Sequence, residues 1–335
     1  MIIIQMHKHI KFYFFFLIFL FLTGYTKAST NEEFKVWLKD FKTEAIEKGI
    51  SEQTVTLVFK NARYLEKVIK YDRRQPEFIE LTEIYVNKRA TKKRAQKAKE
   101  LYLKNKKLFD QVEKNFFVDK ELLLAFWGIE TNFGKYVGKM DIVSSLATLS
   151  VDKRRSAFFS KQLLILLGLV DKQIIEVDTL FGSWAGAIGN FQFMPSTIKS
   201  YAIDYDKHGK IDLKKSKKDS VASAANYIHR MGWKQNTHCY IEVQLNKEIK
   251  EKLINYSARG ISNKLTIKKW KKLGVELPAG IEISKKTKAA LISPDGKTSP
   301  KFLVFGNYER VLQWNRSLRF GISVCKLANM IKNEI

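Results

Sequence analysis

Cysteine is scarce in this chain of 335 residues, with only Cys239 and Cys325 present. Two cysteines exclude a small scaffold held together by many disulfides and leave no zinc-ligand spacing. In an oxidising compartment the two could pair, but 85 residues separate them, and two free, half-buried thiols are an equal alternative. We expect neither cysteine to take part in the chemistry.

Acidic residues are few relative to basic ones, with 34 Asp and Glu against 60 Lys and Arg, a formal net charge of +26. Such a charge favours an anionic partner, namely a cell-wall polymer, a membrane surface or a nucleic acid. However, the basic residues are scattered through every segment, so a general composition bias explains the charge equally well. An RNP-like aromatic motif and a concentrated arginine patch are also missing, and we therefore expect no nucleic-acid partner.

Long apolar runs are absent apart from one near the N-terminus. Lys8 and Lys11 precede an apolar stretch at 12–22, and small residues stand at 26 and 28, the two positions that a signal peptidase reads. The run is too short for a confident membrane span, and no cysteine follows it, which argues against a lipoprotein anchor. We predict a Sec-type signal peptide over 1–28 and a periplasmic protein without stable membrane insertion. An uncleaved N-terminal anchor is the alternative.

A buried helix with a single carboxylate is the most informative feature. Asp119 is a candidate N-cap, residues 122–129 are almost all apolar, and Glu130 ends the run. On a helix, Phe126 and Trp127 lie one turn before Glu130. Aromatic neighbours remove water from a carboxyl group and raise its pKa, which suits a general acid. The alternative is a helix-end glutamate that turns outward to water.

A glycine-rich segment at 182–196 is the second feature. Three glycines in eight residues disfavour a regular helix or strand and suit a tight backbone path close to a ligand or another element. Ser183 and Gln192 stand among these glycines and aromatics as candidate polar contacts. Pro195 predicts the first turn of a following helix. A close-packed structural turn is the alternative.

Residues 204–209 begin like a calcium loop, with Asp204 and Asp206 at the first and third positions and glycine at the sixth. The fifth position is His208, and the twelfth is Lys215 where a calcium loop has glutamate. We predict a vestigial loop without metal, with Asp204 and Asp206 as weak ligand candidates; Asp212 and Asp219 could contribute only to a loop longer than standard. We expect no cofactor.

Helical spacing dominates the rest of the chain and predicts a mainly α protein with a small β-rich part. Residues 64–76 are rich in charge and predict a link between helices. The predicted divisions are a helical region at 29–117, a catalytic core at 118–238, a β-rich subdomain at 239–306 and a returning helix at 307–335. Within the subdomain, 289–293 and 301–305 flank a Pro-Asp-Gly turn and predict a hairpin.

Four motifs resemble the lytic murein transglycosylase B family in residues and in order. They are Gly-Ile-Glu-Thr-x-Phe-Gly at 128–134, Leu-Ala-Thr-Leu-Ser at 146–150, the glycine-rich segment at 182–196 and Trp-Asn at 314–315. The resemblance spans most of the chain after the signal and is weakest before Tyr85 and in the β-rich part. It implies a lysozyme-like α core that acts on peptidoglycan.

The resemblance also implies roles for particular residues. Glu130 falls on the family's catalytic acid/base, Ser183 and Gln192 on residues that contact this carboxylate or the adjacent sugar, and Asn315 on the residue that holds the muramoyl acetamido group. Other positions match aromatic residues of the glycan groove and an arginine pair that meets peptide or lactyl carboxylates: Tyr85, Phe158, Phe193, Trp314, Phe320, Arg154 and Arg155. Phe158, Trp314 and Phe320 stand where tyrosines are common, and Asn190-Phe191 replaces an aromatic-glycine pair.

Only one carboxylate accompanies these motifs, whereas glycoside hydrolysis ordinarily uses two. Asp141 and Asp152 are loop acids whose placement the sequence leaves open. We therefore predict a lytic transglycosylase, in which the substrate's own acetamido and C6 hydroxyl groups replace a second carboxylate and water. The alternatives are a lysozyme-type muramidase and a non-catalytic wall-binding protein. The expected partner is the peptidoglycan glycan strand, and we expect a monomer.

Overall fold

The computed structural model describes residues 31–75, 79–297 and 299–335, so the predicted signal peptide lies outside the described residues. The chain begins with α1 (Asn31–Glu47), α2 (Glu52–Phe59) and α3 (Glu66–Arg73). Ser51 caps α2 by accepting a hydrogen bond from the Thr54 amide. The predicted link at 64–76 is wrong, because α3 forms there and buries Val68 and Ile69 against α9 (Ile142–Val151).

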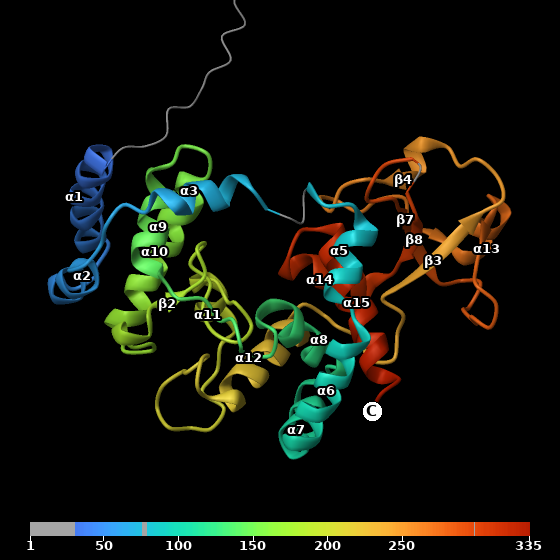
Figure 1. Ribbon diagram of the computed structural model, residues 1–335, viewed down its shortest axis with the longest axis horizontal. Coiled ribbons are helices and arrows are strands. Elements are labelled where there is room, and N and C mark those ends of the chain that lie inside the picture. The colour runs from blue at the N-terminus through green and yellow to red at the C-terminus, as the bar shows by residue number, and fades with distance from the viewer. Residues whose placement is uncertain (1–30, 76–78, 298) are drawn as a thin grey trace, which may run out of the picture.

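The predicted apolar helix is α8 (Lys120–Thr131), and every residue from 122 to 128 is buried. It is enclosed because α15 (Leu318–Lys332) and α6 (Lys92–Lys104) both pack against it, and α7 (Lys106–Phe116) contacts it as well. The last helix of the chain thus returns to the middle of the molecule (Figure 1). Asp119 takes the N-cap position of α8, but its carboxylate accepts from Trp233 Nε1 at 2.6 Å instead of capping the helix.

The remaining helices surround this centre. In Figure 1, α1 to α3 lie beside α9 and α10, at the opposite end of the molecule from the β-rich part. A two-stranded ladder pairs β1 with β2 and leads into the glycine-rich segment. The elements not yet given are α5 (Thr82–Arg89), β1 (Met140–Asp141), α10 (Ser156–Asp171), η1 (Val177–Thr179), β2 (Phe181–Gly182), α11 (Pro195–Tyr201), α12 (Lys217–Arg230) and α14 (Gly306–Trp314).

A small sheet with its own hydrophobic core forms the β-rich part. Its strand order is β4-β7-β8-β3-β6, with β5 on β7, and the antiparallel pair of β7 and β8 confirms the predicted hairpin. Trp270 of α13 (Ile267–Lys272) fills the core and donates to the Ala289 carbonyl at 2.8 Å. The strands are β3 (Tyr240–Leu245), β4 (Ile254–Asn255), β5 (Leu265–Thr266), β6 (Val275–Glu276), β7 (Lys288–Ile292) and β8 (Lys301–Val304), and the short helix η2 (Glu251–Leu253) precedes β4.

A disulfide between Cys239 and Cys325 joins the start of the β-rich part to α15. Of the two alternatives for the cysteines, pairing is the one that the structure shows, because α15 runs past the entrance of β3. Among the described ranges, no helix has the length and apolarity that crossing a bilayer requires.

Candidate active site

Glu130 lies in the last turn of α8 and is half-buried. Its Oε1 accepts a hydrogen bond from Trp314 Nε1 at 2.9 Å, a contact between residues 184 positions apart. Trp314 is the final residue of α14. The structure therefore brings together two residues that the sequence predicts for one site, and the carboxylate is held by a protein donor.

A group of aromatic rings fixes the indole of Trp314. It stacks on Phe126 with ring centres 4.3 Å apart, and Phe193 and Tyr227 contact it at 5.3 and 5.1 Å. Tyr227 comes from α12 and was not a predicted site residue, since an amphipathic helix offers no sign of which distant ring it will meet. Burial raises the pKa of Tyr227 to about 12, so its hydroxyl stays protonated at neutral pH.

Asn190 connects the glycine-rich segment to the end of α8. Its side-chain oxygen accepts from Trp127 Nε1 at 3.0 Å, and its backbone oxygen accepts from Thr131 Oγ1 at 2.8 Å. Its side-chain nitrogen Nδ2 donates to the carbonyls of Leu213 and Lys214 at 3.1 and 2.9 Å. Asn190 thus fastens the end of α8 that carries Glu130 to the residues just before α12. The sequence marks Asn190 only as a departure from the family pattern.

The tight backbone path predicted for the glycine-rich segment is confirmed. Gly189 has φ +77°, and a Cβ there would collide with the Leu213 carbonyl. Ser183 Oγ accepts from the backbone amides of Ala185 and Ala187 at 3.3 and 2.9 Å. Gln192 donates to the carbonyls of Val137 and Gly189 at 3.2 and 2.9 Å. Both predicted polar residues therefore hydrogen-bond to loop backbone, and their roles toward a sugar stay predictions.

Asn315 follows Trp314 directly at the C-terminal end of α14. Its backbone amide donates to Val311 O at 3.2 Å, and its carbonyl accepts from the Ser317 amide at 2.8 Å. These bonds fix the backbone where the chain turns from α14 into α15. The half-buried side chain of Asn315 is one residue away from the indole that contacts Glu130.

The predicted groove aromatics differ in how much surface they present. Phe158 on α10 is 47% exposed, whereas Tyr85 and Phe320 are each 3% exposed. Phe320 packs behind Phe126 with ring centres 6.2 Å apart, and the Arg89 guanidinium covers Tyr85 at 3.4 Å. In this structure Tyr85 and Phe320 support neighbouring residues, so a direct contact of either with glycan stays a prediction.

Arg154 and Arg155 both form ion pairs with Asp72 of α3. Arg154 Nε donates to Asp72 Oδ2 at 2.8 Å, and the Asp72 side chain is almost fully buried. The sequence does not connect these residues, because its charge pattern predicts a link where α3 carries Asp72. Both guanidinium groups remain partly exposed, which leaves room for the predicted contact with an anionic ligand.

The two loop acids considered as a second carboxylate both have structural partners. Asp141 Oδ1 accepts from the Ser144 amide at 2.9 Å and caps α9. Asp152 pairs with Arg73 at 2.8 Å and accepts from the Arg154 amide at 3.0 Å. Each carboxylate is thus committed to holding the backbone or an arginine in place.

The calcium-like loop is organised around a buried carboxylate, Asp219, which accepts from the amides of Tyr205 and Asp212 at 2.8 and 3.0 Å. Burial, followed by the charge of Asp206, raises the pKa of Asp219. The oxygens of Asp204, Asp206 and Asp219 lie within 4.8 Å of one another and of a His208 ring nitrogen. Because calcium prefers an all-oxygen shell with a bidentate glutamate, this imidazole-containing set with Lys215 at the twelfth position does not fit it.

The core of the molecule is helical, and its buried helix α8 ends in Glu130, whose carboxylate accepts a hydrogen bond from Trp314. The comparison with known families agrees with this arrangement. Residues 33–329 match the family model described as "Transglycosylase SLT domain". The chain therefore belongs to this family. The resemblance to lytic murein transglycosylases and the predicted fold class are both confirmed.

Individual relatives match to different extents. The chain is 39% identical over 117 residues to membrane-bound lytic murein transglycosylase B of Escherichia coli (strain K12), covering 35% of this chain and 32% of that protein, about a third of its length. A structure of SltB3 from Pseudomonas aeruginosa in complex with NAG-anhNAM-pentapeptide has a TM-score of 0.80 and 30% identity, covering 89% of this chain and 79% of that one. Slt35 of Escherichia coli, solved in complex with calcium, has a TM-score of 0.76 and 23% identity, covering 89% and 93%, and shows the shared fold alone.

Proposed function

We propose that this protein is a lytic transglycosylase that cleaves the β-1,4 bond between N-acetylmuramic acid and N-acetylglucosamine in peptidoglycan. The observation that carries the proposal is the Glu130–Trp314 hydrogen bond, which joins two of the family motifs at one carboxylate. Family membership and the SltB3 complex with NAG-anhNAM-pentapeptide support the same reaction.

In the proposed mechanism Glu130 handles one proton twice. As an acid it protonates the bridging oxygen, so the bond to the muramoyl C1 breaks and an oxocarbenium-like centre develops. The substrate's acetamido oxygen, oriented by Asn315, shields that centre. Glu130 then accepts the proton of the C6 hydroxyl as its oxygen bonds to C1, which forms a 1,6-anhydro ring without water. The commitments of Asp141 and Asp152 elsewhere support this one-carboxylate scheme.

The substrate would lie across the end of α8 and the glycine-rich segment. We propose Ser183 and Gln192 as contacts beside the scissile bond, with Trp314 beneath the sugars. Phe193, which is 2% exposed, would act through the Trp314 ring that it contacts. Phe158, Arg154 and Arg155 would contact more distant glycan or peptide groups, since these three residues keep exposed surface. Tyr85 and Phe320 would act through the residues they support.

The proposed setting is the periplasm, with residues 1–28 as the export signal and the four predicted divisions of the chain as its working units. The relative named membrane-bound lytic murein transglycosylase B supports a site of action at the cell wall. This part of the proposal is tested by the N-terminal sequence of the protein recovered from a periplasmic fraction.

Mass analysis of products from purified peptidoglycan tests the reaction. The wild-type protein should release 1,6-anhydromuropeptides, and Glu130→Gln should lower the rate by about a hundredfold or more. Glu121→Gln, the same substitution at the other end of α8, is the matched control and should keep the wild-type rate. Reducing ends in place of anhydro ends would indicate a muramidase, and tight binding without any product would indicate a wall-binding protein.

A further inference from the structure

A surface rich in lysine lies on the β-rich part, outside the catalytic site. The segment 265–288 contains seven lysines and only two acids, Glu276 and Glu282. Helix α13 buries Ile267 and Trp270 in the local core, which turns its four lysines outward. These lysines are Lys268, Lys269, Lys271 and Lys272.

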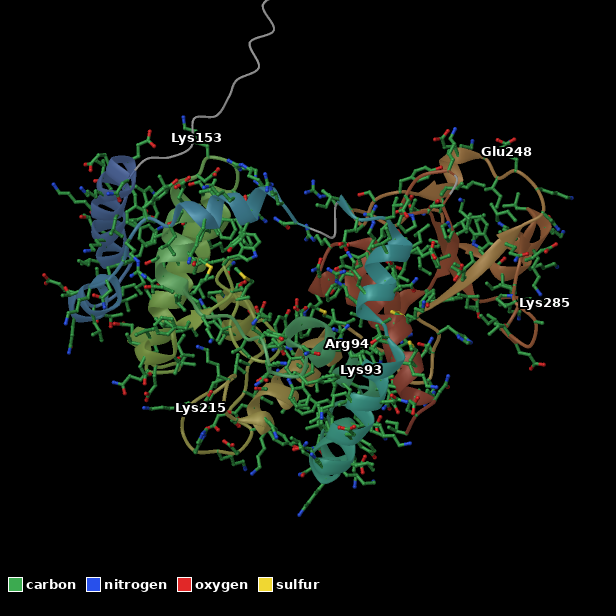
Figure 2. The ribbon with its side chains drawn as sticks, in the orientation of Figure 1. Lys93, Arg94, Lys153, Lys215, Glu248 and Lys285 are labelled. Atoms are coloured by element: carbon green, nitrogen blue, oxygen red, sulfur yellow. A yellow bond between two sulfur atoms is a disulfide. The ribbon has the colours of Figure 1, made fainter. Side chains whose placement is uncertain are left out.

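A second segment adds to the same surface. The Lys268 amide donates to the Lys285 carbonyl at 3.1 Å, and the Ile267 amide donates to the Thr287 carbonyl at 2.9 Å. Lys285 and Lys286 are both exposed. We call the six residues Lys268, Lys269, Lys271, Lys272, Lys285 and Lys286 the lysine surface. Figure 2 shows Lys285 on the outer side of the β-rich part, away from Lys93 and Arg94 of α6.

The lysine surface lacks acidic partners among the residues that the structure describes, since none of its members takes part in an ion pair there. On α6 and α7, Lys97 pairs with Glu100 and Lys106 with Asp110, while other lysines of these two helices form no ion pair among the described residues and so offer a matched comparison. The nearby Glu276 accepts a hydrogen bond from Asn246 at 2.7 Å. Six unpaired ammonium groups on one face attract an extended anionic surface.

Exposed apolar side chains accompany these charges. Leu273, at the end of α13, is 37% exposed, and Ile281 in the loop before Lys285 is 36% exposed. Apolar side chains that stand beside lysines suit a lipid surface, because a bilayer accepts them below the level of its anionic headgroups. We propose that the lysine surface docks the protein on the anionic headgroups of a lipid bilayer.

This docking would orient the enzyme. In Figure 1, α13 lies at one end of the molecule and α1 at the other, with α8 between them. The disulfide between Cys239 and Cys325 ties the β-rich part to α15, which packs on α8. A bilayer under α13 would therefore leave the end of α8 that carries Glu130 free to meet a glycan strand.

Vesicle sedimentation tests the proposal with the whole chain lacking its signal. Wild-type protein should sediment with phosphatidylglycerol–phosphatidylcholine vesicles and not with pure phosphatidylcholine vesicles. Replacing Lys268, Lys269, Lys271 and Lys272 by Gln should weaken binding by about tenfold or more. The control replaces Lys92, Lys93, Lys99 and Lys107 by Gln, the same charge change on α6 and α7, and should bind within about twofold of wild type.

A second variant and a second ligand complete the test. Leu273→Ser leaves the charge unchanged and should also weaken vesicle binding, and thermal unfolding checks that each variant is folded. Equal losses in both lysine variants would overturn the proposal in favour of overall charge. Loss of sedimentation with insoluble peptidoglycan, with vesicle binding unchanged, would overturn it in favour of a wall polymer.

Discussion

Trp314 is the residue on which the geometry of the Glu130 carboxylate depends. Its ring nitrogen reaches Glu130 because Phe126, Phe193 and Tyr227 hold the indole from several sides. A tyrosine, which the resemblance implies is common at this position, would place a hydroxyl at another distance from the carboxylate.

Removing the Trp314 donor should lower activity without unfolding the protein. Trp314→Phe keeps a ring against Phe126 but loses the N–H that orients Glu130, so we expect kcat to fall by about tenfold. Peptidoglycan turbidity assays measure the rate. Trp37→Phe, in α1, removes an indole far from the site and is the control; an equal loss there would contradict the role of the hydrogen bond.

Glu121 gives a prediction that concerns stability. Burial, together with the nearby charges of Glu113 and Asp119, raises the pKa of this carboxyl. The folded state therefore disfavours the charged form, and stability is lost as pH rises through the raised pKa. Below the ordinary pKa both states are protonated and this penalty is absent.

Glu121→Gln should accordingly raise the melting temperature at pH 7 by about 1–3 °C and leave it unchanged near pH 3. Thermal unfolding followed by circular dichroism at both pH values measures the difference. Exposed Glu44 of α1 supplies the comparison, because Glu44→Gln should not produce a gain that depends on pH in this direction. A fall in melting temperature at pH 7 for Glu121→Gln would contradict the sign.

Among the elements, the glycine-rich segment is the one that connects the end of α8 to the chain around Leu213. Its backbone passes so close to the Leu213 carbonyl that no side chain fits at Gly189, and Asn190 fastens it to Trp127 and Thr131. The glycine-rich segment therefore lies between α8 and the residues that precede α12 and contacts both. Its sequence predicts the tight path, but not the elements between which it runs.

Gly189→Ala should destabilise the protein more than Gly260→Ala. Both glycines have positive φ, +77° and +78°, so both substitutions carry the left-handed penalty of about 1–2 kcal/mol. Only at Gly189 does the new methyl group also meet backbone, whereas nothing lies within 4 Å at Gly260. Urea unfolding should place the two midpoints clearly apart, and lytic activity should fall only for Gly189→Ala. Equal midpoints would show that the loop relaxes.

At the scale of the whole molecule, the two hydrophobic cores are separate, and a covalent bond links their elements. The larger core gathers the helices and one face of β7 and β8, and the smaller one lies against the other face of these strands and contains Trp270. Cys239 precedes β3, and Cys325 lies in α15. The disulfide thus closes a loop with a sequence separation of 86 that contains the β-rich part.

Removing this bond should cost about 2–4 kcal/mol of unfolding free energy, because the unfolded chain regains the freedom that a long closed loop denies it. Replacing both cysteines by Ser should lower the urea midpoint, and a reductant should lower that of the wild type alone. Thiol titration in denaturant without reductant should detect no free thiol. Two free thiols would restore the alternative left open by the sequence.

Much of the fold and site could be predicted because their signals are local. Burial of 122–128, the Ser51 cap, the hairpin of β7 and β8 and the path at Gly189 each depend on a pattern of neighbouring residues or on one backbone angle. The family motifs likewise lie within short stretches. Periodicity failed at 64–76, where charge on the outer face concealed a helix whose inner face is only two apolar residues.

Local patterns in the amino-acid sequence are enough to single out the residues that matter: a lone carboxylate at a buried helix end, glycines in a tight backbone path, and a tryptophan-asparagine pair. Only the folded chain shows which of these residues contact one another. The contacts are the hydrogen bond of Glu130 with Trp314, the ion pairs of Asp72 with Arg154 and Arg155, and the disulfide of Cys239 with Cys325. The physical reason is that each of these contacts joins segments far apart in the chain. Their distance is set by how whole helices pack, and no local pattern records it.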